Sequence, residues 1–278
     1  GGDSLYAFSS DGEILWKYPT AGGLDIKNAP IIDSSGNIYY AAVDSIGKPS
    51  LFSITSNGTF RWKYQYDKTA LACSSPAFST DYKRVYIAFK DTVFSINANN
   101  GQKNWEFKPD DIGDGVFRAS CAVDNENNVY IGSKKNENSV FYKIKSDGTL
   151  EWENNIGADL YSSPALGNNR TVYVGSEWAG FDEDCKICYR YRFHALDIDN
   201  GEKKYSVELK GDVTWNSPVL TDEGIVYIAT MQGCDPTEED NCTCGGVVYA
   251  IQSDSTDILK NSGSPMFHGG SSNTGRRE

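Results

Sequence analysis

The chain has 278 residues, of which 39% are hydrophobic and 23% are charged, as in folded globular proteins. Its formal net charge of −12 argues against nucleic-acid binding, because phosphate recognition draws on clustered Lys and Arg. No apolar stretch approaches the roughly 20 residues of a membrane-spanning helix. With only 2 histidines, neither a His-based metal site nor Ser-His catalysis is expected. The 13% aromatic content and the 27 glycines favour short strands joined by tight turns.

One segment recurs along the chain. Residues 5–16 (LYAFSSDGEILW) return as residues 51–62 (LFSITSNGTFRW). Further copies lie at 93–105, 141–152, 193–205 and, in degenerate form, 248–259. Each copy is typical of a β-hairpin, because an alternating run leads through a turn with glycine into a second alternating run. The turn glycines are 46, 43, 47 and 53 residues apart, and an aromatic residue follows each after four positions. The repeated positions are Gly12, Gly58, Gly101, Gly148 and Gly201, with Trp16, Trp62, Trp105 and Trp152.

A second motif precedes each hairpin. It is a Ser-Pro or related pair followed about nine residues later by tyrosine, as in Ser163-Pro164 and Tyr173. One unit therefore carries four short strands at a period of roughly 45 residues, which is typical of a β-propeller blade. We predict an all-β fold of four-stranded antiparallel blades, in which each outer-strand tryptophan packs on the next blade. A β-solenoid is the competing architecture, although its repeats are usually shorter.

The repeats predict one propeller domain over residues 1–278. Six blades are expected, with the last assembled from both ends of the chain, because this closure removes exposed sheet edges. The alternative is a fragment of a seven- or eight-bladed ring. The predicted blades are 28–66, 74–108, 118–156, 162–210 and 216–260, with a closing blade from 1–20 plus 264–278.

The repeat is similar to that of a known family. The segments ALDIDNGE at 195–202, SSPAL at 162–166 and VYVG at 172–175 resemble the pyrroloquinoline-quinone-like (PQQ-like) β-propeller repeat. The tail at 264–276 resembles a terminal segment of such domains. The resemblance implies either a quinone-dependent dehydrogenase, with PQQ and calcium, or a non-enzymatic scaffold.

The scaffold branch of this family fits the sequence better than the dehydrogenase branch. Many dehydrogenases of the family place an adjacent-cysteine disulfide against the quinone, and this sequence has no Cys-Cys pair. Their calcium ligands and catalytic aspartate map onto no position of this chain. We therefore expect no cofactor and no catalytic residues, and we keep a PQQ-dependent oxidoreductase as the alternative.

Two insertions of about ten residues each interrupt consecutive repeats at 176–192 and 231–246, and they hold five of the 7 cysteines. We predict polar loops here, stapled by disulfides whose pairing the sequence does not reveal. A four-thiolate zinc site built from Cys185, Cys188, Cys242 and Cys244 is the alternative. The cysteines concerned are Cys185, Cys188, Cys234, Cys242 and Cys244.

The first insertion also carries aromatic residues. We interpret them as a contact surface, with packing inside the loop as the alternative; they are Trp178, Phe181, Tyr189 and Tyr191. His194 replaces a repeat aromatic and is interpreted as a core or channel-lining residue.

Equivalent loops of adjacent blades lie on one face of a propeller, so we expect this face to bind a partner, most simply a protein. Cysteine-bearing loops favour an extracellular, cell-surface or periplasmic location. The predicted function is a non-catalytic scaffold of an exported or cell-envelope protein. A sensor or adhesin module of a larger surface protein is a further alternative, and the sequence does not indicate an oligomeric state.

Overall fold

The computed structural model is all-β. Every regular element in the described part of the chain is a strand, and no helix with the length and hydrophobicity of a membrane span occurs there. The predicted all-β class is therefore confirmed. The described residues are 4–19, 28–70, 74–110, 112–134, 139–182, 185–213, 216–221, 223–231 and 246–253, with only the backbone described at 180–182 and 185–188.

Three of the antiparallel sheets have four strands in chain order, as predicted for a blade. The first consists of β3 (Ile31–Ile32), β4 (Ile38–Val43), β5 (Pro49–Ile54) and β6 (Phe60–Gln65). The second consists of β7 (Ala77–Phe78), β8 (Arg84–Phe89), β9 (Thr92–Asn97) and β10 (Lys103–Phe107). The third consists of β16 (Ala165–Gly167), β17 (Thr171–Asp182), β18 (Cys185–Asp197) and β19 (Lys203–Leu209).

The remaining sheets depart from four strands. One sheet has five strands, because the two short strands β11 and β12 both pair with β13. Its members are β11 (Val116–Phe117), β12 (Ala122–Val123), β13 (Val129–Lys134), β14 (Val140–Ile144) and β15 (Leu150–Asn155). The other two sheets are the three-stranded β20 (Val219–Leu220), β21 (Ile225–Met231) and β22 (Gly246–Gln252), and the hairpin of β1 (Ser4–Phe8) and β2 (Ile14–Pro19). The fourth strand predicted near 254–260 and the 264–278 part of the closing blade lie outside the described residues, so the number of blades stays a prediction.

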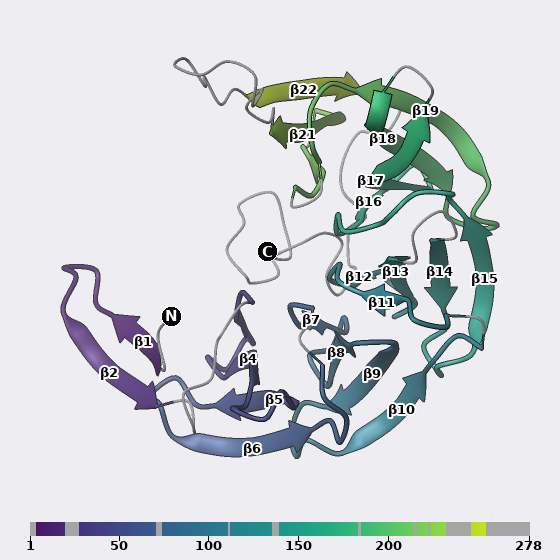
Figure 1. Cartoon of the computed structure of the whole chain (residues 1–278). Coiled ribbons are helices and arrows are strands. Elements are labelled where there is room, and N and C mark those ends of the chain that lie inside the picture. The colour runs from purple at the N-terminus through teal and green to yellow at the C-terminus, as the bar shows by residue number, and fades with distance from the viewer. Residues whose placement is uncertain are drawn as a thin grey trace.

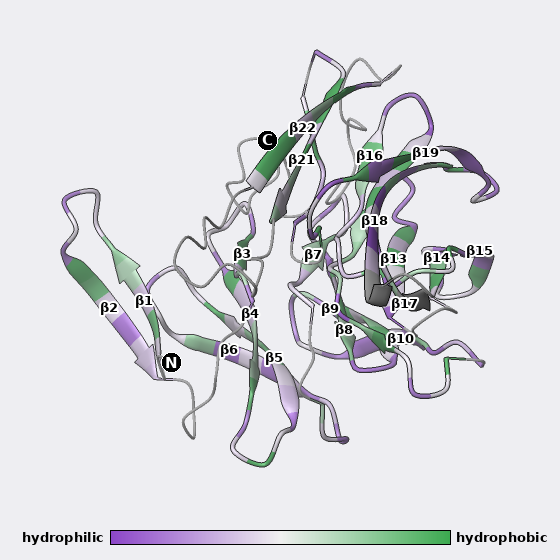
Figure 2. Cartoon of the chain, turned by 45° about the horizontal axis from the view of Figure 1, so that its top comes forward, coloured by the Kyte–Doolittle hydropathy of each residue, from purple (hydrophilic) through white to green (hydrophobic). Residues whose placement is uncertain are grey.

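The sheets surround a common centre. Figure 1 shows β7, β12 and β16 on the inner side and β6, β10, β15 and β19 along the outer rim. Each core cluster is shared by two consecutive sheets; one of them joins Tyr39 and Leu51 of the first four-stranded sheet to Phe78 and Ile87 of the second. Hydrophilic residues gather at hairpin turns such as that between β1 and β2, and hydrophobic residues along strands such as β22 (Figure 2). Each sheet therefore depends on its neighbours to bury its apolar side chains.

The repeated tryptophans lie against the turn glycines of the next sheet. These glycines have φ between 73° and 92°, which a glycine adopts without strain. A Cβ atom built on any of them would lie 2.5–3.0 Å from a ring carbon of the facing tryptophan. Glycine is thus required both by the backbone conformation and by the close approach of the ring. The contacting pairs are Gly58 with Trp16, Gly101 with Trp62, Gly148 with Trp105 and Gly201 with Trp152.

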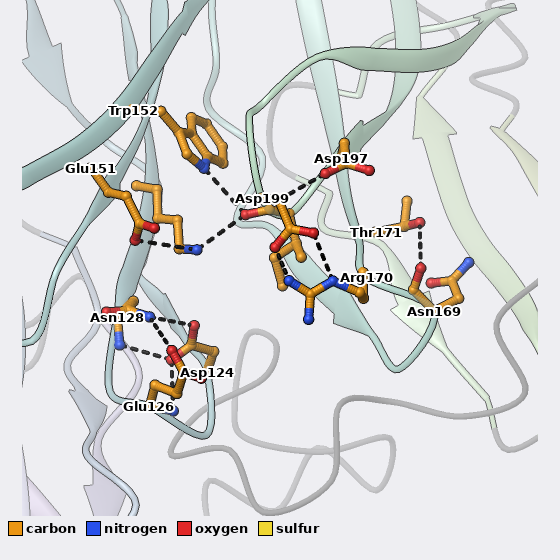
Figure 3. A network of polar contacts seen from close by, with 12 residues as sticks. Asp124, Glu126, Asn128, Glu151, Trp152, Asn169, Arg170, Thr171, Asp197 and Asp199 are labelled. Atoms are coloured by element: carbon orange, nitrogen blue, oxygen red, sulfur yellow. Dashed lines mark hydrogen bonds and ion pairs between the residues drawn. The ribbon is translucent and has the colours of Figure 1, made fainter.

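Each tryptophan also donates a hydrogen bond across the sheet interface. The indole Nε1 atoms lie 2.8–3.1 Å from backbone carbonyl oxygens of the neighbouring hairpin turn. Trp152 donates to Ile198 O, and Lys143 Nζ donates to the same oxygen while its charge pairs with Glu151 (Figure 3). The outer strand of one sheet is therefore fixed to the turn of the next by packing and by a directed hydrogen bond.

A second series of hydrogen bonds joins the sheets at their inner ends. In each step, the backbone N–H before the first strand donates to the serine hydroxyl at the equivalent position of the next sheet, over 2.9–3.2 Å. These serines belong to the repeated Ser-Pro motif, whose hydroxyl role the sequence did not reveal. The series runs Ala29, Ser75, Ser120, Ser163 and Ser217.

Replacing Ser120 by alanine should lower the free energy of unfolding by about 1–3 kcal/mol, because the buried N–H of Ser75 would lose its acceptor. Chemical denaturation measures the loss. The matched control is Ser10→Ala, in an exposed turn, for which we expect no measurable change. Equal stability of the two variants would contradict the structural role of the inner hydrogen bonds.

In two of the sheets, an aspartate closes the turn between the first and second strands. Asp124 Oδ1 accepts the N–H groups of Glu126 and Asn128, and Oδ2 accepts from the Asn128 amide (Figure 3). Asp124 Oδ2 also accepts from the Tyr130 hydroxyl. Asp33 makes the same set of bonds within its own turn. The motif tyrosines of these two turns, Tyr39 and Tyr130, are therefore buried with their hydroxyls satisfied.

Candidate functional site

The β17–β18 hairpin is the feature that departs most from the repeat. β17 has 12 residues, whereas β4, β8 and β13 have 6 each. The prediction of a polar loop at 176–192 is wrong, because the β17–β18 ladder continues through it to the pairs Gly180↔Cys188 and Asp182↔Cys185. The insertion lengthened both strands by matching amounts, and its aromatic and β-branched residues suit an extended conformation. The second insertion lies mostly outside the described residues; its ends pair as Met231↔Gly246.

The aromatic residues of this hairpin lie on two faces. Tyr189 is paired with Ala179 and Trp178 with Arg190, so the two rings point to opposite sides of the ribbon. Tyr189 is 54% exposed and stacks on Tyr191, with ring centroids 6.4 Å apart. Burial against the next sheet raises the pKa of Tyr191 to about 12. The side chain of Phe181 lies outside the described residues.

The Trp178 face forms a pocket of about 240 Å³ between the hairpin and the segment that follows β15. Arg190, Arg192 and Lys203 line it, and among the described residues no carboxylate does. The Arg190 guanidinium lies over the Trp178 ring, 5.5 Å from its centroid. Three cationic side chains thus converge on one pocket of a chain whose net charge is −12.

His194 lies at the buried end of this pocket and is 1% exposed. Its Nε2 atom is 2.7 Å from Ser176 Oγ, and its Nδ1 atom has no hydrogen-bond partner among the described residues. Burial, with a smaller effect of the Lys203 and Arg192 charges, lowers the pKa of His194 to about 3. The imidazole is therefore neutral near pH 7, and it adds no charge to the pocket.

This lowered pKa has a consequence for stability. Because the value in the folded chain lies below the ordinary value of 6.5, the unfolded chain binds a proton that the folded chain does not. The free energy of unfolding should therefore fall as the pH falls below 6.5, by about 1.4 kcal/mol per pH unit from this group. Phe94 occupies the position of the repeat that is equivalent to His194. The variant His194→Phe, which places the same aromatic residue there, should remove the contribution of His194 to the pH dependence. Urea denaturation from pH 7 to pH 4 measures it, and parallel pH profiles would contradict the assignment.

The predicted cysteine chemistry stays a prediction. Cys185 and Cys188 belong to β18, but their sulfur atoms lie outside the described part, as do Cys234, Cys242 and Cys244. Within that part, no three His, Cys, Asp or Glu side chains form a group that could hold a metal. Cys121 is a buried free thiol, and burial raises its pKa to about 12.

Sequence reasoning missed most of the pocket. Arg190, Arg192 and Ser176 carry no motif, and only the ladder register shows that they share a face with Trp178 and His194. The replacement of a repeat aromatic by His194 is the signal that the sequence does carry, and it predicts a core or channel-lining residue. Its burial agrees with a core position, and its place at a pocket between two sheets was not foreseen.

Solved structures share this architecture. The quinohemoprotein alcohol dehydrogenase of Comamonas testosteroni matches with a TM-score of 0.67 and 12% identity, over 92% of this chain and 56% of that chain. Quinohemoprotein alcohol dehydrogenase ADHIIG of Pseudomonas putida HK5 matches with a TM-score of 0.65 and 12% identity, over 92% of this chain and 55% of that chain. The Dos1 propeller matches with a TM-score of 0.59 and 14% identity, over 96% of this chain and 64% of that chain. The chain spans little more than half of the two dehydrogenases. At these identities the likeness shows a propeller fold alone.

A family sequence model matches most of the chain. The model PQQ_2, described as outer membrane protein assembly factor BamB, matches residues 1–179 and 90–233. No curated protein matches the sequence. The matched regions include the tryptophan–glycine hairpins and the Ser-Pro motifs that join the sheets. The chain therefore belongs to the PQQ-like, BamB-type family of β-propeller repeats.

Proposed function

We propose that this chain is a non-catalytic scaffold that binds another protein through the tip of the β17–β18 hairpin. The observation that carries the proposal is the pairing of this tip. β19 pairs with β18 no further than Tyr191, and β16 pairs with β17 no further than Tyr173. Beyond the bridge between Glu177 and Asp159, the described residues of the two strands pair only with each other.

A protruding two-stranded ribbon has properties that suit protein binding. Its outer edges present backbone groups that an added strand of a partner can pair with. Tyr189 adds an exposed ring held in place by stacking on Tyr191, and tyrosines often contribute most of the binding energy at interfaces. The rigid stack of sheets behind the ribbon fixes its position, which reduces the entropy lost on binding.

We also propose that the ring has six blades, with β1–β2 as part of the closing blade. Trp16 of β2 packs on Gly58 and donates to Ser56 O, so this hairpin joins the first four-stranded sheet through the same contacts as the others. An exported or cell-envelope location belongs to the same proposal, and its support is the group of five cysteines between 185 and 244.

Site-specific photo-crosslinking tests the binding surface. A photoreactive phenylalanine analogue replaces Tyr189 in the intact protein in its native cells, and the matched control carries it at Phe60, an aromatic of similar exposure on β6. We expect a discrete adduct with one protein from position 189 and none from position 60. The absence of an adduct at 189, or the same adduct from both positions, would show that the hairpin tip is not the binding surface.

A further inference from the structure

The pocket behind Trp178 has the charge and the lining of a binding site for an anion. Arg190, Arg192 and Lys203 come from two strands of one sheet and converge on a single hollow. A concave site lined by one sign of charge concentrates ligands of the opposite sign. The attraction is local, because the chain as a whole carries a net charge of −12 and repels anions elsewhere.

Arg192 is held only weakly by the carboxylate that it faces within its own sheet. Arg192 Nη2 is 3.7 Å from Glu208 Oε2, and the two side chains are 44% and 67% exposed. An exposed ion pair of this kind contributes little to stability, so Arg192 can exchange Glu208 for a ligand at little cost. The Arg190 guanidinium lies over the face of Trp178, which places a further cation beside the apolar wall of the pocket.

The remaining walls restrict the kind of anion. Ile156, Ala158 and Trp178 supply an apolar side, which inorganic phosphate or sulfate could not contact favourably. The volume of about 240 Å³ is below the roughly 300–1,000 Å³ of sites for drug-sized ligands. A nucleotide or a quinone cofactor is therefore too large, whereas a group of side-chain size fits.

We propose that this pocket binds a carboxylate carried on a short apolar stem. Arg192 and Lys203 pair with the carboxylate, and Ile156, Ala158 and Trp178 contact the stem. The neutral His194, held by Ser176, forms the base without attracting a second anion. The ligand is a free aliphatic acid or a carboxylate of a peptide, since both present this chemistry. The site lies on the face of the hairpin opposite Tyr189, so it goes beyond the proposed protein-binding surface and does not depend on it.

Isothermal titration of the intact protein with hexanoate tests the proposal. We expect saturable binding of hexanoate. Replacing hexanoate by acetate should weaken the affinity about tenfold or more, and so should each of the single substitutions Arg192→Gln and Lys203→Gln. The matched control is Lys103→Gln, because Lys103 occupies in β10 the place of Lys203 in β19, two residues after the turn glycine. This variant should bind hexanoate as the native protein does.

Several results would overturn the proposal. Binding of hexanol as tight as that of hexanoate would show an apolar cavity, and displacement of hexanoate by equimolar phosphate would show a site for any anion. Equal losses in Lys103→Gln and Lys203→Gln would show general charge attraction. Melting temperatures of all variants confirm that they are folded. Competition with a short peptide that ends in leucine decides the source of the carboxylate, and the peptide is used with a free and with an amidated C-terminus. Displacement of hexanoate by the free form alone identifies a peptide as the source. Failure of the free form to displace hexanoate identifies a free acid.

Discussion

Replacing Trp62 by alanine is expected to lower the free energy of unfolding by about 3–5 kcal/mol, the range found for large aromatic residues in packed cores. Trp62 is 6% exposed, lies against Gly101 and Tyr39, and donates through Nε1 to Ala98 O. Its removal would open a cavity between two sheets and leave that carbonyl with the longer hydrogen bond from the Tyr39 hydroxyl, at 3.3 Å, in place of two. Denaturation by urea, followed by circular dichroism, measures the loss.

Two further variants separate the contributions of Trp62. Trp62→Phe keeps much of the packing and loses the hydrogen bond, so we expect a smaller loss of stability, to which the lost hydrogen bond contributes about 1 kcal/mol. Tyr6→Ala, at a position 40% exposed, should change stability little and serves as the control. A loss for Trp62→Ala no larger than that for Tyr6→Ala would contradict the role of the tryptophans as contacts between sheets.

Among the repeated turn glycines, Gly201 should be the one at which an added methyl group destabilises the protein most. Its φ is +74° and a Cβ would lie 2.5 Å from Trp152 Cε3, so both backbone strain and a clash arise. We expect about 1–2 kcal/mol from the left-handed backbone and about 1–3 kcal/mol from overpacking. Thermal and urea denaturation measure the sum.

The repeat itself supplies the control for Gly201. Gly12 occupies the equivalent turn with φ +85° and no atom within 4 Å of a built Cβ, and Gly47 has φ +80° with its nearest atom at 3.7 Å. Alanine at either position should cost only the backbone strain. If Gly201→Ala and Gly12→Ala destabilise the protein equally, the close approach of Trp152 contributes nothing to the interface.

The repeated part of the fold was predictable because its signals are local. A turn glycine four residues before an aromatic, at intervals near 45 residues, requires only the period of a hairpin and the twist of its turn. In the structure, the tryptophan of each copy lies against the turn glycine of the next copy, from Trp16 with Gly58 to Trp152 with Gly201. The serine hydrogen bonds at the inner ends were not predicted, because they join residues about 45 positions apart whose alignment only the assembled sheets reveal.

The candidate site was less predictable for a physical reason. In a strand the side chains alternate, so the pocket residues Ser176, Trp178, Arg190 and Arg192 are separated in sequence by residues of the opposite face. An insertion that adds equal lengths to two strands looks like a loop until its register is known. The sequence therefore indicated where the chain departs from its repeat and that aromatic residues gather there, and the ladder showed that Trp178 and Tyr189 serve different faces.

The central claim is that this chain binds its ligands at the extended β17–β18 hairpin, where it departs from its repeat. Hydrogen exchange of this hairpin tests the claim most directly. Amide exchange is measured by mass spectrometry with and without saturating hexanoate. We predict slower exchange in the segments around Ser176, Arg190 and Lys203, with no change in the equivalent segments of the β8–β9 hairpin and β10. Unchanged exchange at the hairpin, or slowing of equal size in both sheets, would contradict the account.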